Sequence, residues 1–330
     1  MVMNVIERLS HRTRIILGKE IDWSEHRKSF GNLHPDKTFY VIRRRNGHVG
    51  INSQFNTGMG HVRYAINHGW IPVIDMQNYP NEYLEPLEKG HKNAWEFYFN
   101  QPFGGQYSLN EVYKSRNVVL SSGEPLPVCP NDSMEFFTRP DLIRMWSRYF
   151  HKYIGFSPEL SHEVNKNYLQ YLSDKKEGRI LGVSLRGTDY LAKPYEHPVQ
   201  PSIEQALKTT RRVMLEQRCE WVYLTAEDIQ ILDAYKKEFG DKLIYIKEAQ
   251  MYDKLLPGEN IAGHSFDREN DKYLRGMEYM TQKALLTKCN CLIGGRTSGN
   301  VAAMVWQPEY DYTYFWNLGR YGIDDVLDEV

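Results

Sequence analysis

RILGVSLRGTDY, residues 179–190, is a short apolar run that ends in arginine, glycine and small polar residues. The part from Arg179 to Leu185 is typical of a buried strand, because it is brief and apolar and a glycine follows it. Arg186 then stands at the carboxyl end of that strand. Ligands of open α/β sheets bind at such ends, so this guanidinium indicates an anionic ligand. In the alternative, Arg186 pairs with a carboxylate such as Asp189 and only fixes the turn.

Beyond this strand, the second half of the chain alternates between predicted strands and helices. The pattern predicts strands over 179–185, 219–228, 242–247 and 289–295, and helices over 201–218, 228–239, 273–288 and from 298 onward. Strands alternating with helices of this length favour a doubly wound parallel sheet. We therefore expect residues 178–305 to form a Rossmann-like domain.

The first half predicts a second α/β unit. TFYVIRR (38–44) and WIPVIDMQN (70–78) are expected strands, and a glycine-bearing loop running into a helix (46–69) connects them, which makes a βαβ unit. An irregular, aromatic-rich insertion follows within the expected N-terminal domain, 1–177. Residues 306–330 are expected to pack back on that domain as a tail. The predicted fold is α/β, with two Rossmann-like domains facing a cleft.

Composition excludes several partners. The chain has 41 basic and 42 acidic residues, a formal charge of -1, so no basic excess attracts nucleic acid or anionic lipid. Four cysteines are too few for a disulfide framework, and no apolar run suits membrane insertion. We expect a soluble cytoplasmic protein, with a peripheral position at the inner membrane face as an alternative. The oligomeric state cannot be inferred from these numbers.

GGRTSGNVAAMVW (294–306) predicts an anion site at a helix N-terminus. A strand that stops in two glycines and restarts as a helix after Thr297, Ser298 and Gly299 presents free backbone N–H groups and hydroxyls. Together with Arg186, this segment would hold a diphosphate. In the alternative it is an ordinary capped helix.

Two further segments supply candidate ligand contacts. VYLTAED (222–228) ends a strand with Thr225, Glu227 and Asp228, whose oxygens could accept hydrogen bonds from a base or ribose; helix capping by Asp228 is the alternative.

FNTGMGHVRYA (55–65) belongs to the other domain. Gly58 and Gly60 would permit close backbone approach at a helix start, with Asn56, His61 and Arg63 toward a phosphate or an acceptor. Arg63 occupies the third glycine position of the dinucleotide fingerprint, so the match to G-x-G-x-x-G is incomplete. A histidine satisfied by backbone groups is the alternative for His61.

Missing motifs narrow the chemistry. The chain has no phosphate-binding P-loop motif and no two aspartates two positions apart, so the acidic metal–diphosphate site of one glycosyl-transfer architecture is missing. Cys289 and Cys291 lack a second ligand pair, which favours buried small residues over zinc. We expect no metal and no cofactor, with cationic side chains and helix ends in the place of a metal.

These motifs resemble those of a known family. VSLRGTDY with the later HPV (197–199), WVYLTAED, and LLTKCNCLIGGRTSGNVAAM (285–304) are similar to the three motif regions of α-1,6-fucosyltransferases and their nodulation-factor relatives. FNTGMGHVRYAINHGWIPVIDMQN and NAWEFYFNQP resemble bacterial capsule-cluster proteins of that type. The resemblance is strongest from 179 to 306. It implies a GT-B-like fold, a metal-independent inverting mechanism, and a GDP-sugar donor such as GDP-fucose.

The resemblance also implies roles for residues. By position, Arg186 is similar to the arginine that holds the donor β-phosphate, Asp189 to the acid of the same loop, and Asp228 to an acid near the nucleoside. Thr297 and Ser298 match the hydroxyl pair at the diphosphate. Glu278 is the candidate for an acid on the preceding helix, with Gln282 as a competing alignment. The remaining donor-side candidates are Gly187, Thr225, Glu227, Arg296, Gly299 and Asn300.

The chain departs from the family pattern at three places. Gly187 and Tyr190 stand where relatives usually carry basic residues, and the expected catalytic acid is out of register, with Glu196 beside His197. The general base is therefore either Glu196 or Asp189. We expect sugar transfer from a nucleotide diphosphate to a glycan or polysaccharide hydroxyl. The alternatives are a nicotinamide-dependent oxidoreductase and a non-catalytic nucleotide- or glycan-binding protein.

Overall fold

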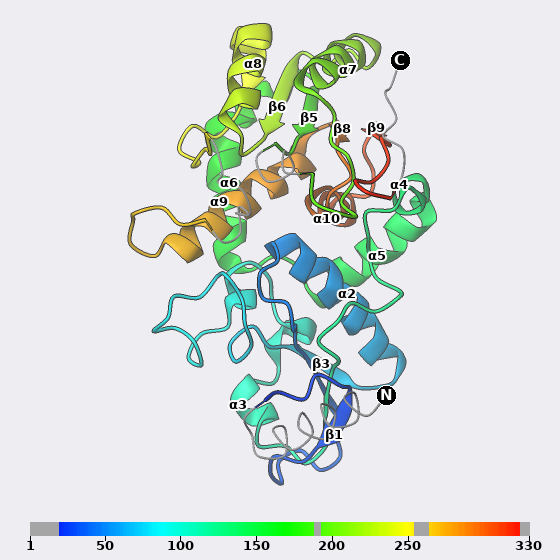
Figure 1. The fold of residues 1–330 in the computed structure, drawn as a ribbon, viewed down its shortest axis with the longest axis vertical. Coiled ribbons are helices and arrows are strands. Elements are labelled where there is room, and N and C mark those ends of the chain that lie inside the picture. Colours follow the sequence, from blue (N-terminus) through cyan, green and yellow to red (C-terminus); the bar gives the residue numbers. More distant parts are fainter. Residues whose placement is uncertain (1–19, 188–192, 254–263, 324–330) are drawn as a thin grey trace.

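The computed structural model describes residues 20–187, 193–253 and 264–323, which form two α/β lobes (Figure 1). The lobes follow one another along the longest axis of the molecule. Strand order is β1-β4-β2-β3 in the sheet of the first lobe and β7-β6-β5-β8-β9 in the sheet of the second. The α/β fold class predicted from the sequence is confirmed.

Short strands and mostly short helices build both lobes. The strands are β1 (His26–Lys28), β2 (Phe39–Ile42), β3 (Ile71–Ile74), β4 (Val118–Leu120), β5 (Ile180–Ser184), β6 (Trp221–Thr225), β7 (Leu243–Ile244), β8 (Cys291–Gly294) and β9 (Tyr312–Phe315). The α-helices are α2 (Ile51–Asn67), α3 (Leu109–Val112), α4 (Met134–Thr138), α5 (Pro140–Tyr153), α6 (Pro158–Tyr171), α7 (Ile203–Glu216), α8 (Ile229–Phe239), α9 (Asp271–Leu285) and α10 (Ser298–Trp306). Short 3₁₀ turns lie at Ala94–Phe97, Pro102–Gly105, Ser173–Lys175, Gly240–Lys242 and Leu286–Lys288.

The second sheet is parallel throughout, with β5 at its centre. All five residues of β5 are buried, because β6 and β8 pair with it on its two sides and helices cover the sheet. The chain leaves β5 toward β6 and β7 on one side and returns to β8 and β9 on the other. Strand order therefore reverses between β5 and β8, where Ser184 lies opposite Gly294. Doubly wound sheets bind their ligands at this switch point, outside the carboxyl ends of the strands.

In the first sheet, β2 pairs in parallel with β3 and β4, and β1 adds an antiparallel edge. Helix α2 connects β2 to β3. It begins at Ile51, so Gly58 and Gly60 lie in the middle of the helix rather than at its start. This differs from the expected loop. Glycine at position 60 lets another segment of the protein pack against the helix, because a Cβ on Gly60 would lie 2.7 Å from Cys129.

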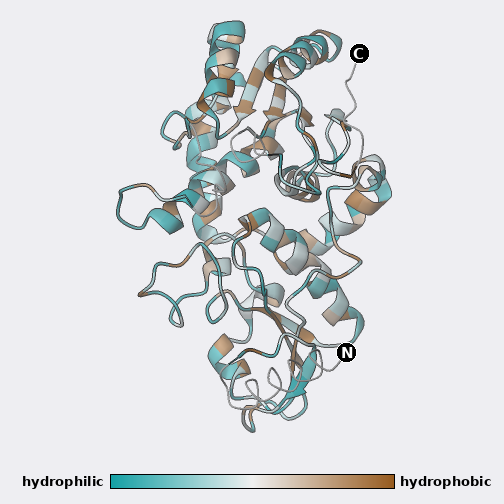
Figure 2. Cartoon of the chain, viewed as in Figure 1, coloured by the Kyte–Doolittle hydropathy of each residue, from teal (hydrophilic) through white to brown (hydrophobic). Residues whose placement is uncertain are grey.

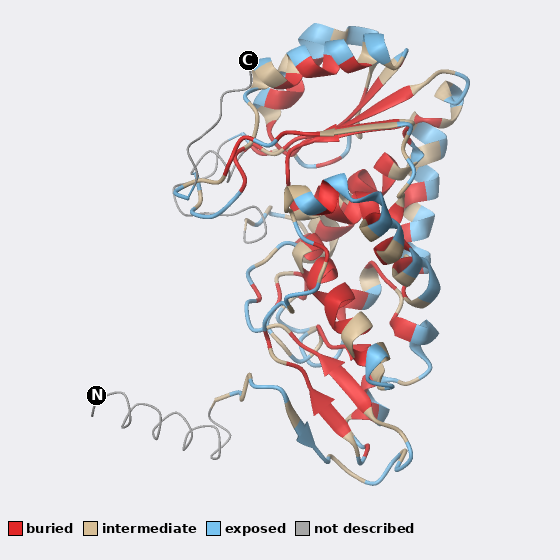
Figure 3. Cartoon of the chain, turned by 90° about the vertical axis from the view of Figure 1, so that its right-hand side faces the viewer, coloured by how far each residue is buried: buried red, intermediate tan, exposed pale blue. Residues whose placement is uncertain are grey.

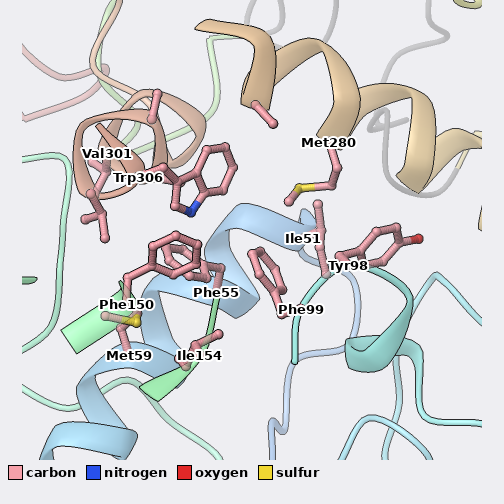
Figure 4. Packing of buried hydrophobic residues seen from close by; sticks show 14 of the residues in the cluster. Ile51, Phe55, Met59, Tyr98, Phe99, Phe150, Ile154, Met280, Val301 and Trp306 are labelled. Carbon is pink, nitrogen blue, oxygen red and sulfur yellow. The ribbon is translucent and has the colours of Figure 1, made fainter. Parts of the chain in front are cut away.

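One hydrophobic cluster joins the two lobes (Figure 4). Phe55 of α2 and Phe150 of α5 come from the first half of the chain, and Trp306 of α10 comes from the second. The Phe55 and Trp306 ring centroids are 5.6 Å apart, and Trp306 also packs on Phe156 at 5.1 Å. The apolar face of α2 therefore faces α10 as well as its own sheet.

Polar residues face outward around this core. The outer faces of α7 and α8 are exposed and hydrophilic, while the strands beneath them are buried and apolar (Figures 2 and 3). Ser202 caps α7, since its hydroxyl accepts from the Gln205 amide and the Gln205 side chain accepts from the Ser202 amide. In the part of the chain that the structure describes, no helix has both the length and the apolar character needed to cross a membrane.

The chain after residue 306 adds to the second lobe. The sequence leads us to expect a tail on the first domain, whereas β9 pairs in parallel with β8 and extends the second sheet. Contacts with the first half remain: the Arg320 guanidinium donates to Asp132 at 2.7 Å, and Phe315 stacks near Phe137 with ring centroids 4.1 Å apart.

Candidate active site

Arg186 lies at the switch point of the second sheet, just after β5. Its side chain is 17% exposed and its guanidinium donates to Oε1 of Glu227 at 3.2 Å. Glu227 follows β6, the neighbouring strand, and is itself buried. Glu227 is therefore one carboxylate partner of Arg186. Asp189, the carboxylate that the sequence suggests, lies outside the described residues.

The N-terminus of α10 faces the same point from the end of β8. Thr297 caps the helix, since its hydroxyl accepts from the Asn300 amide at 3.3 Å. Gly299 lets the Tyr279 hydroxyl approach the first turn closely, because a Cβ at this position would lie only 2.7 Å from that hydroxyl. A helix N-terminus carries partial positive charge and amides that suit an anion.

Helix α2 of the first lobe reaches this point too. Asn56 donates from Nδ2 to the Ser298 carbonyl at 3.1 Å. Asn52, one turn earlier, is 2% exposed, and its Nδ2 lies 3.4 Å from the position that a Cβ on Gly299 would take. The described structure gives neither Nδ2 nor Oδ1 of Asn52 a hydrogen-bond partner. We call Arg186, Glu227, Lys283, Gly299 and Asn52 together the switch-point site.

Within the described residues, several buried polar atoms at this place have no hydrogen-bond partner. Besides both side-chain atoms of Asn52, these are Oδ1 of Asn56, Oε2 of Glu227 and Oδ1 of Asn300. Buried polar groups in folded proteins are nearly always hydrogen-bonded, so a cluster of exceptions indicates a missing ligand. Acceptors predominate here beside the cationic Arg186. The ligand that fits would offer hydrogen-bond donors as well as negative charge.

Lys283 of α9 lies beneath the ends of β5 and β6. It is 2% exposed, and its ammonium donates to Oγ of Ser184 at 2.8 Å and to Oγ1 of Thr225 at 3.0 Å. Burial lowers the pKa of Lys283 to about 8; the charge of Glu227 acts in the opposite sense, and that of Arg186 lowers the pKa further. Thr225, predicted as a donor-side residue, is thus held by a lysine that the sequence reasoning missed.

Gly187 leaves no room for a side chain. A Cβ at this position would overlap the carboxylate of Asp228. Asp228 caps α8 by accepting from the Gln230 amide at 2.7 Å, so the capping role that the sequence leaves open is present. The missing basic residue after Arg186 therefore has a steric reason in this chain.

The other predicted donor-side residues have structural partners. Glu278 forms a two-pronged ion pair with Arg268, at 2.5 and 3.1 Å. The Arg296 guanidinium donates to the Asp132 carbonyl at 2.8 Å and to the Asn317 side chain at 2.5 Å. Asn300 donates to the Gly295 carbonyl at 2.7 Å, which fixes the loop before α10.

Of the first-lobe candidates, only Asn56 joins the switch-point site through described contacts. His61 is fully buried between the Tyr40 hydroxyl at 3.0 Å and the Glu124 carbonyl at 2.9 Å, the alternative that the sequence leaves open. Burial lowers the pKa of His61 to about 4. Arg63 stacks over Trp146, 5.4 Å from the ring centroid, and Gly58 packs on Trp95.

Glu196 lies next to the C-terminal segment. Its backbone bonds to Tyr321 and Arg320, and its φ is 66°, a left-handed value that is uncommon outside glycine. Its side chain is exposed. The choice between Glu196 and Asp189 as base stays a prediction.

A pocket in the first lobe lies at the carboxyl ends of β2 and β3. Its polar lining includes Arg44, Gln54, Thr57 and Asp75. Arg44 bonds to the Thr57 hydroxyl, and burial lowers the pKa of its guanidinium. This is the side of the molecule where the sequence places the acceptor.

Sequence reasoning missed Lys283 and Asn52, although each leaves a signal. Met277, Met280 and Ala284 mark the apolar face of α9, and Lys283 is a charged residue on that face. On α2, Asn52 precedes Asn56 by one turn, beside the apolar stripe of Ile51 and Phe55. Polar residues on a buried helix face are the pattern to look for.

No protein-family model matches the sequence, and neither does any curated protein. Among solved structures, the chain is similar to the fucosyltransferase NodZ from Bradyrhizobium, at 16% identity over 88% of this chain and 99% of that one, with a TM-score of 0.48. NodZ α-1,6-fucosyltransferase soaked with GDP-fucose gives 16% identity, 82% and 94% coverage, and a TM-score of 0.47. POFUT1 in complex with GDP is 12% identical to this chain over 88% of this chain and 75% of that one, with a TM-score of 0.38.

Proposed function

We propose that this protein is a glycosyltransferase that uses a nucleotide-diphosphate sugar, with a GDP-sugar of the fucose type as the favoured donor. The observation that carries the proposal is the convergence at the switch-point site of Arg186, the N-terminus of α10 and the unpartnered Asn52. Donors from three elements suit a diphosphate. The unpartnered acceptors, Glu227 foremost, suit the N–H and O–H groups of a base and a ribose.

The chemical step would be displacement at the anomeric carbon of the donor. Negative charge develops on the leaving diphosphate as the glycosidic bond lengthens, and groups already aimed at that charge lower the barrier. Arg186 and the first amides of α10 would do this without a divalent ion. Asp189 or Glu196 would take the proton of the acceptor hydroxyl, which typically contributes about 10² to 10⁴ in rate.

The acceptor proposed is a glycan or polysaccharide hydroxyl. A capsule polysaccharide is the specific acceptor that the sequence resemblance suggests.

Ligand binding tests the donor class first. A thermal-shift panel of GDP, UDP, ADP and NAD, each with excess EDTA, should show stabilisation by GDP above the others. Stabilisation by UDP or ADP would change the nucleotide, and stabilisation by NAD alone would favour an oxidoreductase. Nucleotide binding without release of sugar to any acceptor would favour a non-catalytic binding protein.

Substitution then tests the site. Because removing Arg186 alone would strand the buried carboxylate of Glu227, the pair is removed together as Arg186→Ala with Glu227→Gln. We expect this variant to fold and to lose transfer. The matched control removes the ion pair at the opposite end of β5, Arg179→Ala with Asp311→Asn, whose atoms are 2.9 Å apart. Equal activity of the two variants would contradict the assignment.

A further inference from the structure

The second cation of the switch-point site comes from an unexpected element. Gly187 has no room for a side chain beside Asp228, so a basic residue cannot follow Arg186 here. Lys283 approaches the same place from α9, beneath the carboxyl ends of β5 and β6. Its Cε lies 3.4 Å from the position of a Cβ on Gly299, at the start of α10.

The contacts of Lys283 orient hydroxyl groups at the carboxyl ends of β5 and β6 toward a ligand. Its ammonium donates to the hydroxyl oxygens of Ser184 and Thr225, the last residues of β5 and β6. A hydroxyl that accepts from an ammonium keeps its own proton for another acceptor. The described contacts give neither hydroxyl proton an acceptor within the protein. Both hydroxyls, and the third proton of the ammonium, are therefore available to oxygen atoms of a ligand.

We propose that Lys283 is a diphosphate-binding cation of this protein, which acts with Arg186 on the leaving group through its charge and through the hydroxyls of Ser184 and Thr225. The inference rests on the proposed function, since it presupposes a nucleotide-diphosphate donor. It assigns to α9 the second positive charge, which position 187 cannot carry.

Among the described residues, Lys283 has neighbours on several elements. Arg186 and Glu227 face it from the loops after β5 and β6, and Tyr279, one turn earlier on α9, has its ring centroid 5.6 Å from the ammonium. Asn52 of α2 and Gly299 of α10 also lie close to it and carry no charge. A bound diphosphate would raise the pKa of Lys283 from about 8, so binding near pH 8 would draw protons from solution.

Calorimetric titration with GDP and GMP tests the proposal. Lys283→Met should weaken GDP binding by about ten- to a hundredfold, the effect of one hydrogen bond to a charged group, and GMP binding much less. The control is Lys288→Met, an exposed lysine that follows the same helix; it should bind both ligands like the wild type. Equal losses for GDP and GMP would indicate a structural role and overturn the proposal.

A second readout needs no substitution. At pH 8, titrations in buffers of different ionisation enthalpy should show uptake of up to about half a proton per GDP by the wild type, and none by Lys283→Met if it folds. GDP binding without proton uptake by the wild type would refute the role of Lys283 and leave the proposed function standing. If the wild type binds no nucleoside diphosphate at all, the proposed function itself fails.

Discussion

The buried lysine makes a quantitative prediction about folding stability. In the folded protein the pKa of Lys283 is about 8, against 10.5 for an ordinary lysine. The unfolded chain therefore holds a proton between pH 8 and 10.5 that the folded protein does not, and folding stability rises with pH across this window. At about 1.4 kcal/mol for each tenfold change in proton affinity, the full effect is about 3 kcal/mol.

The assay is urea unfolding of the wild type and of Lys283→Met at pH 7, 8.5 and 10. Methionine fills similar space without charge. It therefore removes the cost of burying the charged ammonium at pH 7, and its own contribution to stability does not rise when the pH is raised to 10. Tyrosines and cysteines titrate in both proteins and cancel in the comparison. We expect the stability of Lys283→Met relative to the wild type to fall by about 3 kcal/mol between pH 7 and pH 10. An identical pH dependence of the two proteins would refute the reasoning.

Three further predictions follow from the site and its support. Gly187→Ala should cost about 1 to 3 kcal/mol of stability, because the new methyl group overlaps the Asp228 cap; Gly50→Ala, whose methyl group would meet nothing within 4 Å, is the control in thermal unfolding. Asn52→Leu should weaken GDP binding in calorimetry without lowering the melting temperature, since the ligand-free protein loses only unpartnered polar atoms, whereas Asn56→Leu should lower that temperature because it breaks the bond to Ser298. Burial of His61 lowers its pKa to about 4, below the unfolded value of 6.5. Its contribution to folding stability is therefore intact above pH 6.5, and about 3 kcal/mol is lost as the pH falls to 4. In urea unfolding, His61→Asn should not show this loss.

Most strands and helices of the second lobe, β9 excepted, were predictable because local pattern and tertiary structure agree there. The apolar run 179–185 became β5 (Ile180–Ser184), and the expected helix over 228–239 became α8 (Ile229–Phe239). The central strands β5 and β8 are buried along their whole length, so their residues form nearly continuous apolar runs. The position of Arg186 at the strand end follows from the same pattern.

Other elements depended on distant partners that no local pattern reveals. β4 is three residues long and exists because β1 and β2 pair with it. Helix α2 continues through Gly58 and Gly60, against their low helix propensity, because Trp95 and Cys129 pack on them. The role of Lys283 was hidden for the same reason, since Ser184 and Thr225 lie 99 and 58 positions away in sequence.

The shared cluster of Phe55, Phe150 and Trp306 has a consequence for protein engineering. Because these rings pack residues from both halves of the chain together, cutting near residue 177 would expose a large hydrophobic surface on each fragment. Chimaeras that exchange one lobe for that of a relative would need complementary packing between α2 and α10. Calorimetric heating should accordingly melt both lobes in one cooperative transition.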